Sequence, residues 1–294
     1  MPPPSSNPLP ESGDNLPEPS PIASADLCVP LDTAQITPPE STPTLSAEPR
    51  RFPPWSAWDV LAVLSFTVFA VFLFSIIALA IARRIPEYRR VPLADLATNA
   101  RIVVGAQAAA YPIVLIFIFL LVRTKTRERF RDAIHWNWPG IYGIGFFVGG
   151  TILAVVVEGL SSYLPIPKSL PMDKYFHDAT SAYLMAAFGM SLAPLLEELF
   201  FRGMLYPLLR RAFRLSIAVL LTAAAFAAIH GAQLGYAWGP ILSIFVVGVA
   251  FTVTRVRTNS VAASFLMHCG YNSALFTALW IASDHFRHLE KVAG

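Results

Sequence analysis

Charge and cysteine are both scarce in this sequence of 294 residues. Only 14% of the residues are charged, whereas 55% are hydrophobic, a balance that indicates a membrane protein rather than a water-soluble domain. The two cysteines, Cys28 and Cys269, are too few for a disulfide framework and leave the redox compartment undetermined. Cys269 adjoins His268, but a single thiol with no second one nearby is more typical of a small buried residue than of a metal ligand.

The first 49 residues contain no Lys or Arg. They hold 13 of the 25 prolines and seven acidic residues. With few large apolar side chains, they cannot bury enough surface to offset the entropy of ordering. We therefore predict a disordered, Pro-rich acidic tail over residues 1–54. It also lacks the basic and apolar regions of a signal peptide.

Long apolar runs fill the remainder of the chain, residues 55–294. Seven of them approach the length of about 20 residues that a helix needs to cross the hydrocarbon core, and barrel strands are about half as long. We predict an all-α fold, a multi-pass transmembrane helical bundle. The predicted spans are Asp59–Ala82, Ile102–Val122, Ile141–Leu160, Ala182–Phe201, Ser216–His230, Pro240–Val256 and Val261–Ile281.

Basic residues are unevenly distributed along the chain. Residues 50–294 hold all 22 Lys and Arg against 12 Asp and Glu, mostly in short loops, which favours contact with anionic lipid and not with nucleic acid. With seven spans, 13 basic residues fall on the side of the N-terminal tail and nine on the other side. The positive-inside rule then predicts a cytoplasmic tail. From the size and simplicity of the chain we expect a bacterial plasma membrane.

Two adjacent carboxylates, Glu197 and Glu198, interrupt the fourth apolar run. An ionised side chain within a bilayer is costly, so it is usually paired or faces a wet cavity in which it has a function. Glu198 and Arg202 are four residues apart and share one helix face, which predicts an ion pair. Glu197 lies about 100° round the helix and has no such partner. A desolvated carboxylate of this kind suits a general base.

Two histidines and an asparagine extend this set of intramembrane polar residues. His230 could share a water molecule with Glu197. His268 and Asn272 are four residues apart and project from one helix face, where paired donors can stabilise a developing oxyanion. Buried His and Asn also hydrogen-bond membrane helices to one another, so each residue alone is equally open to a structural interpretation.

These residues form three ordered motifs. The motifs are Glu197-Glu198-Leu-Phe-Phe-Arg202, Phe226-Ala-Ala-Ile-His230 and His268-Cys-Gly-Tyr-Asn272. Together they resemble the CPBP family, the membrane proteins that include CAAX prenyl endopeptidases and bacteriocin-processing proteins and are also called the Abi family. The resemblance covers residues 182–280, which form the motif core of a CPBP-like protease domain over residues 55–294.

The resemblance implies an intramembrane endopeptidase that hydrolyses peptide bonds of membrane-associated substrates with a glutamate-activated water. It implies that Glu197 and His230 activate the water and that His268 and Asn272 form the oxyanion site. In the same way, it implies that Glu198 and Arg202 support the site.

A zinc-dependent mechanism is the first alternative. The family has also been described as metalloproteases, which makes Glu197, His230 and His268 a candidate set of three zinc ligands with an open position. The sequence lacks the H-E-x-x-H element of most zinc-protease helices. We favour a mechanism without a cofactor.

Other classes of membrane protein fit less well. No G-x-S-x-G element is present for a serine protease, and Asp59 is the single Asp in an apolar run, where an aspartyl protease needs two. Buried Glu, His and Arg also build the proton relays of transporters, but the sequence contains no inverted repeat. A transporter, or a scaffold that binds a partner without catalysis, is the remaining alternative.

Overall fold

The structure is a computed structural model that describes residues 53–289. These residues belong to one compact unit, Pro49–Gly294, and they contain helices and loops but no β-strand. The all-α prediction is therefore confirmed for the described part of the chain. The prediction of a disordered tail over residues 1–54 lies outside the described residues, apart from Pro53 and Pro54.

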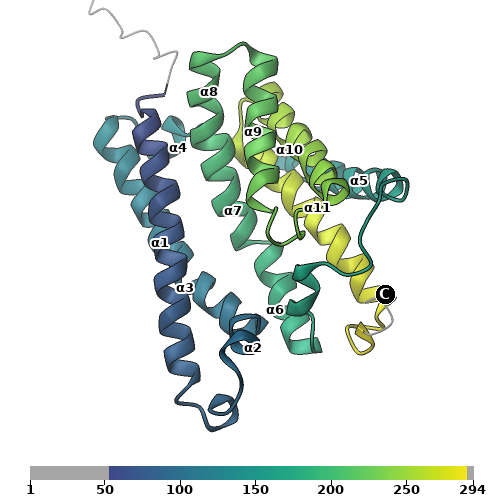
Figure 1. The fold of residues 1–294 in the computed structure, drawn as a ribbon. Helices are drawn as coiled ribbons and strands as arrows, with labels where there is room; N and C mark the ends of the chain where they lie inside the picture. The colour runs from purple at the N-terminus through teal and green to yellow at the C-terminus, as the bar shows by residue number, and fades with distance from the viewer. Residues whose placement is uncertain (1–52, 290–294) are drawn as a thin grey trace, which may run out of the picture. The chain divides into compact units, whose positions relative to one another are not determined.

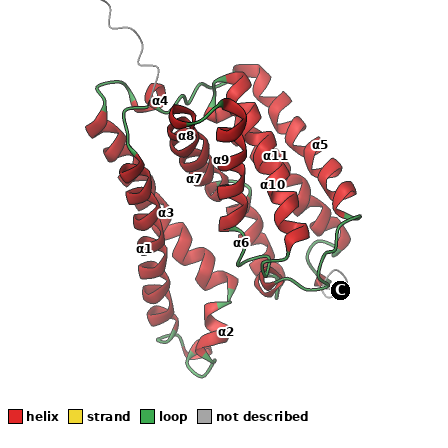
Figure 2. Cartoon of the chain, turned by 45° about the horizontal axis from the view of Figure 1, so that its top comes forward, coloured by secondary structure: helices red, strands yellow, loops and turns green. Residues whose placement is uncertain are grey.

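Helices of very different lengths make up the bundle (Figures 1 and 2). In chain order, the helical elements are α1 (Ala57–Ala82), η1 (Pro86–Tyr88), α2 (Leu93–Ala97), α3 (Ala100–Lys125), α4 (Phe130–Ala133), η2 (Gly140–Tyr142), α5 (Gly143–Ser161), η3 (Pro171–Tyr175), α6 (Ala179–Gly189), α7 (Leu192–Glu198), the π-helix η4 (Leu199–Leu205), α8 (Tyr206–Ala212), α9 (Leu215–Ile229), α10 (Trp238–Thr258) and α11 (Val261–Ala282).

Five helical segments in the described chain are long and apolar enough to cross a bilayer, so the prediction of seven spans is wrong in number. The five are α1, α3, η2 with α5, the segment from α6 to α8, and α10. The predicted span Ser216–His230 corresponds to α9, whose 15 residues extend about 22 Å, short of the hydrocarbon thickness of about 30 Å. The predicted span Val261–Ile281 corresponds to α11, which is long enough but carries the polar residues His268 and Asn272 at its centre.

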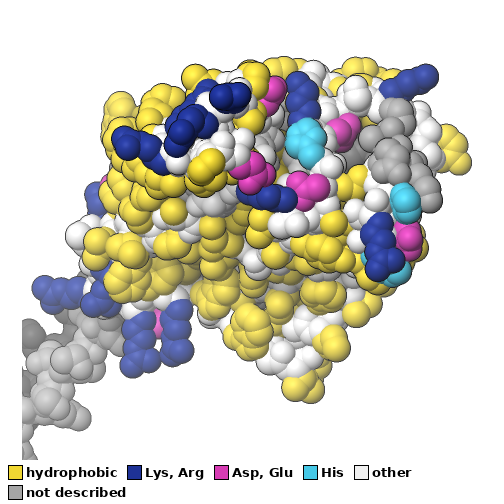
Figure 3. Space-filling view, turned by 90° about the horizontal axis from the view of Figure 1, so that it is seen from below, with side chains coloured by type: hydrophobic (Ala, Val, Ile, Leu, Met, Phe, Trp, Pro, Cys, Tyr) yellow, Lys and Arg dark blue, Asp and Glu magenta, His cyan; other side chains and the backbone are white. Residues whose placement is uncertain are grey.

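Apolar side chains on the outward faces of the long helices support a membrane location. Val68 and Phe72 on α1 are 63% and 64% exposed, and Val155 on α5 is 68% exposed. Figure 3, seen from below, shows hydrophobic side chains over much of the surface and charged side chains gathered in separate groups. Lipid is the solvent that makes such faces favourable. The chain is thus a multi-pass membrane protein.

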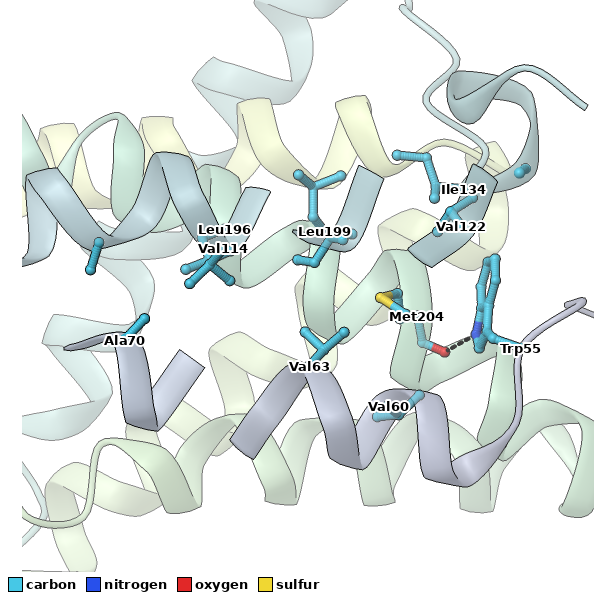
Figure 4. Packing of buried hydrophobic residues seen from close by; sticks show 13 residues of the cluster. Trp55, Val60, Val63, Ala70, Val114, Val122, Ile134, Leu196, Leu199 and Met204 are labelled. Carbon is cyan, nitrogen blue, oxygen red and sulfur yellow. Dashed lines mark hydrogen bonds between the residues drawn. The ribbon is translucent and has the colours of Figure 1, made fainter. Parts of the chain in front are cut away.

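A buried cluster holds α1 and α3 against the carboxylate-bearing segment (Figure 4). Val63 from α1 and Val114 from α3 pack with Leu196 from α7 and Met204 from η4. The indole N–H of Trp55, just before α1, donates to the carbonyl of Met204 at 3.0 Å. The start of α1 is therefore fixed to the π-helix, which positions the segment that carries Glu197 and Glu198.

A pair of glycines brings α5 and α11 into close contact. A Cβ atom added at Gly150 would overlap the backbone carbonyl of Met267, and one added at Gly270 would overlap that of Phe147. The Thr151 hydroxyl donates to the Gly270 carbonyl at 3.3 Å. Small residues permit this kind of backbone approach between membrane helices. The contact determines where α11, and with it His268, lies in the bundle.

We expect Gly150→Ala to lower the stability of the protein by about 1–3 kcal/mol, because the added methyl group meets a backbone carbonyl that cannot rotate away. Gly149→Ala is the matched control, since a Cβ atom at Gly149 has no atom within 4 Å. Thermal unfolding in detergent measures both. Equal midpoints for the two variants would contradict the close helix contact.

Candidate active site

The segment that carries the carboxylates is not one continuous α-helix. The predicted span Ala182–Phe201 is interrupted at Met190 and Ser191, where α6 ends and α7 begins. Pro194 lies in the first turn of α7, a position that tolerates proline. After Glu198 the helix widens into the seven-residue π-helix η4. π-helical turns are rare and occur frequently at functional sites.

Glu198 and Arg202 form the ion pair that their spacing predicts. Arg202 Nη1 lies 2.8 Å from Glu198 Oε1, and both side chains are fully buried. Arg202 Nη2 donates to the carbonyl of Gly248 on α10 at 3.0 Å. The guanidinium carbon lies 4.5 Å from the ring centroid of Phe226 and 5.4 Å from that of Phe251. The aromatic faces add cation–π attraction to a charge that water does not reach.

His268 lies between the two carboxylates. Its Nδ1 is 3.0 Å from Glu198 Oε1, and its Nε2 is 3.7 Å from Glu197 Oε2. The side chain is 5% exposed, and the ring of Phe251 stacks on the imidazole with centroids 4.6 Å apart. Contacts on both nitrogens and on one face fix the orientation of the ring. The fold thus joins α11 to α7, which lies 70 residues earlier in the chain.

The two adjacent carboxylates differ in environment. The Glu197 side chain is 19% exposed, whereas that of Glu198 is fully buried. No Arg or Lys in the described residues forms an ion pair with Glu197. The distance of 3.7 Å between Glu197 Oε2 and His268 Nε2 is too long for a direct hydrogen bond. At this distance, both groups could contact one water molecule. Glu198 is thus committed to structural contacts, and Glu197 is accessible.

His230 and Asn272 border this network without joining it. His230 Nδ1 lies 2.9 Å from the Phe226 carbonyl of its own helix. The Phe226 ring lies against both histidines, with centroid distances of 4.9 Å to His230 and 5.7 Å to His268. Asn272 Nδ2 donates to the Gly189 carbonyl at the end of α6, at 2.6 Å. Within residues 53–289, neither side chain forms a hydrogen bond or an ion pair with Glu197.

Comparison with known families identifies the segment that holds these residues. Residues 179–274 match the family model described as "Type II CAAX prenyl endopeptidase Rce1-like". The chain carries an Rce1-like domain. The matched segment is about a third of the chain and runs from α6 into α11. Searches of curated proteins and of solved structures gave no match.

The Rce1-like domain contains all three motifs, so the resemblance to the CPBP family is confirmed. The family is one of endopeptidases, and the surrounding helices are those of a membrane protein. The domain is accordingly that of a membrane-embedded protease.

Sequence reasoning missed two contributors to the site in the Rce1-like domain, Gly248 and Phe251. The Gly248 carbonyl binds Arg202, and the Phe251 ring contacts both Arg202 and His268. An aromatic residue or a glycine within an apolar helix resembles ordinary packing, so the sequence holds no signal for either role. Only Arg202 and His268, the polar residues that they contact, belong to motifs that can be detected in the sequence.

A zinc site built from Glu197, His230 and His268 is the alternative to a glutamate base in this domain. In the described part of the chain, no group of three His, Cys, Asp or Glu side chains is arranged to hold a metal ion. His268 Nδ1 already faces Glu198, and His230 Nδ1 faces its own helix. The residues present therefore do not form a three-donor set in this arrangement.

Substitution of each carboxylate should separate their structural contributions. We expect Glu198→Gln to destabilise the protein by about 3–5 kcal/mol, because it leaves the buried Arg202 charge without its partner. Glu197→Gln should change stability by less than about 1 kcal/mol, since Glu197 is accessible and forms no ion pair with arginine. Thermal unfolding in detergent compares the two. A larger loss for Glu197→Gln would reverse the assignment.

Proposed function

We propose that this protein is an intramembrane endopeptidase that hydrolyses peptide bonds of membrane-associated substrates by a water molecule that Glu197 activates. The observation that carries the proposal is the position of the accessible Glu197 carboxylate, 3.7 Å from His268 Nε2 and beside the buried Glu198–Arg202 pair. The candidate base and the candidate hydrogen-bond donor thus lie next to one another.

The proposed donor role of His268 requires a proton on each ring nitrogen. Glu198 and Arg202 neutralise one another, which leaves Glu197 as one negative charge. The Glu198 carboxylate next to Nδ1 holds a proton on that nitrogen. A second proton on Nε2 gives an imidazolium opposite Glu197 and a site without net charge. In a low-dielectric interior a balanced set of charges is strongly preferred.

The proposed reaction keeps this balance. Glu197 takes a proton from water while the water oxygen attacks the carbonyl carbon of the peptide bond. The negative charge moves to the carbonyl oxygen, where the Nε2–H of His268 donates to it. As the C–N bond breaks, Glu197 returns the proton to the leaving amine nitrogen. The products are a carboxyl group and an amine, and the site regains its starting state.

His230 and Asn272 have proposed roles at the edge of the site. Because His230 Nδ1 contacts the Phe226 carbonyl, its Nε2 remains available to orient the attacking water with Glu197. Asn272 uses one amide hydrogen for the Gly189 carbonyl and has a second one for the oxyanion. Glu198 and Arg202 act as positioning residues through His268.

The proposed substrate is a peptide or protein segment within or beside the bilayer, and nucleic acid has no role. We propose a bacterial plasma membrane with the basic loops in the cytoplasm. Figure 1 supports the placement of these basic segments on one side of the membrane, since the start of α1, α4 and the α8–α9 turn share one end of the bundle. The basic residues of α4, of α8 and of the loops beside them are Arg127, Arg129, Arg131, Arg210, Arg211 and Arg214.

Glutamate substitution tests the base directly. We expect Glu197→Gln to reduce the kcat of peptide cleavage by about 100-fold or more, the usual contribution of a general base. Glu158→Gln, an exposed carboxylate near the end of α5, is the matched control and should retain activity. The assay uses the purified full chain in nanodiscs, with new termini in membrane peptides detected by mass spectrometry. Unchanged cleavage by Glu197→Gln would refute the proposal.

Metal content and pH dependence distinguish the glutamate mechanism from the zinc alternative. We expect less than about one-tenth of an equivalent of zinc per active site, and a rate that falls as acid protonates Glu197, because only the carboxylate accepts a proton. Near-stoichiometric zinc that is lost in His230→Ala and His268→Ala would overturn the glutamate mechanism. Elemental analysis of active protein and a pH–rate profile provide the two measurements.

A further inference from the structure

A second polar site lies at the end of the bundle where α1 begins and where α3 and α10 end. It is a pocket of about 610 Å³, and none of the candidate catalytic residues line it. Its polar lining consists mainly of Arg255, Arg210, Glu128, Asp132, His135 and Tyr206.

Arg255 is the buried cation of this pocket. It is 4% exposed and lies one turn before the end of α10. Its Nη1 donates to the side-chain oxygen of Asn259 at 2.8 Å, and its guanidinium lies 5.9 Å from the ring centroid of Tyr206. Across residues 53–289 no carboxylate forms an ion pair with it, and its Nε has no hydrogen-bond partner. A buried charge without a counter-charge is costly, so Arg255 is suited to bind an anion.

The rim of the pocket carries charges of both signs. Arg210, at the end of α8, is exposed, as are Glu128 and Asp132 in and beside α4. Asp132 lies 3.5 Å from Arg131 Nε. The lining therefore has the Arg255 cation at the buried end, and Arg210 together with the carboxylates of Glu128 and Asp132 at the exposed end. A ligand with a phosphate and an ammonium group matches this order, whereas a purely anionic ligand meets the two carboxylates as like charges.

The depth of the pocket favours a lipid as the source of such a ligand. Trp55 precedes α1, Thr126 follows α3, and Val256 lies near the end of α10, and all three line the pocket. The ends of membrane-spanning helices lie at headgroup level. Arg255 lies one helical turn deeper in the bundle than Asn259, which caps the end of α10. In a phosphoethanolamine lipid, the phosphate likewise lies deeper in the membrane than the ammonium group.

We propose that this pocket binds the headgroup of a phosphoethanolamine lipid, with the phosphate at Arg255 and Arg210 and the ammonium group at Glu128 and Asp132. Basic pockets among membrane helices hold lipid headgroups in this way. The proposal is independent of catalysis, since it uses none of the residues of the Rce1-like motifs.

Binding of short-chain phosphatidylethanolamine to the delipidated full chain in detergent, measured by native mass spectrometry, tests the proposal. We expect Arg255→Gln to weaken binding about tenfold, the effect of losing one charge-assisted hydrogen bond to a charged ligand. Arg257→Gln is the matched control, because Arg257 is exposed on the same helix and does not line the pocket. Equal binding by wild type and Arg255→Gln would overturn the proposal.

Three further comparisons keep the test decisive if Arg255→Gln does not fold. Phosphatidylcholine of equal chain length has the same phosphate but no N–H donors, so it should bind more weakly. The exposed double variant Glu128→Gln/Asp132→Asn should abolish that preference. Glycerophosphoethanolamine without chains should bind more weakly than the lipid. No preference in the wild type, or equal binding of the chainless compound, would refute the lipid assignment.

Discussion

The buried ion pair between Glu198 and Arg202 is the interaction on which the rest of the site depends. Two charges without solvent access are costly to bury in a membrane protein. Contacts with other helices offset part of this cost, because Arg202 binds the Gly248 carbonyl of α10 and Glu198 binds His268 of α11. Among the described residues, Glu198 Oε2 and Arg202 Nε are left without a hydrogen-bond partner. One ion pair joins three segments that are far apart in the sequence, and the rings of Phe226 and Phe251 enclose it.

That network explains why two adjacent glutamates have different properties. Glu197 precedes Glu198 by one residue, so its side chain leaves the helix about 100° away from that of Glu198. It therefore lies away from Arg202 and near Nε2 of His268. The pair holds the imidazole at Nδ1, so the Nε2 that faces Glu197 has a defined position. Close approach of α5 and α11 at Gly150 and Gly270 sets the depth of that imidazole. Preorganisation of this kind is what stabilisation of a transition-state charge requires.

The sequence predicts the parts of this arrangement that follow from local spacing. Glu198 and Arg202 are four residues apart, and that spacing alone indicates their ion pair. Apolar runs predict the helices, including the 15-residue length of α9, but they do not reveal that η4 is a π-helix. The contacts of Asn272 with Gly189 and of Phe251 with His268 depend on tertiary packing. They carry no periodic signal, so only the three-dimensional structure identifies them.

Coupling between Glu197 and His268 is the central claim, and a double-mutant cycle on kcat/KM measures it most directly. The cycle compares Glu197→Gln, His268→Gln and the double variant in the same membrane preparation, with folding checked by thermal unfolding. If the two residues act on one water and one oxyanion, the double variant should be about as slow as Glu197→Gln alone, because catalytic groups that act as a unit are not additive. Losses that multiply in the double variant would show independent action and contradict the account.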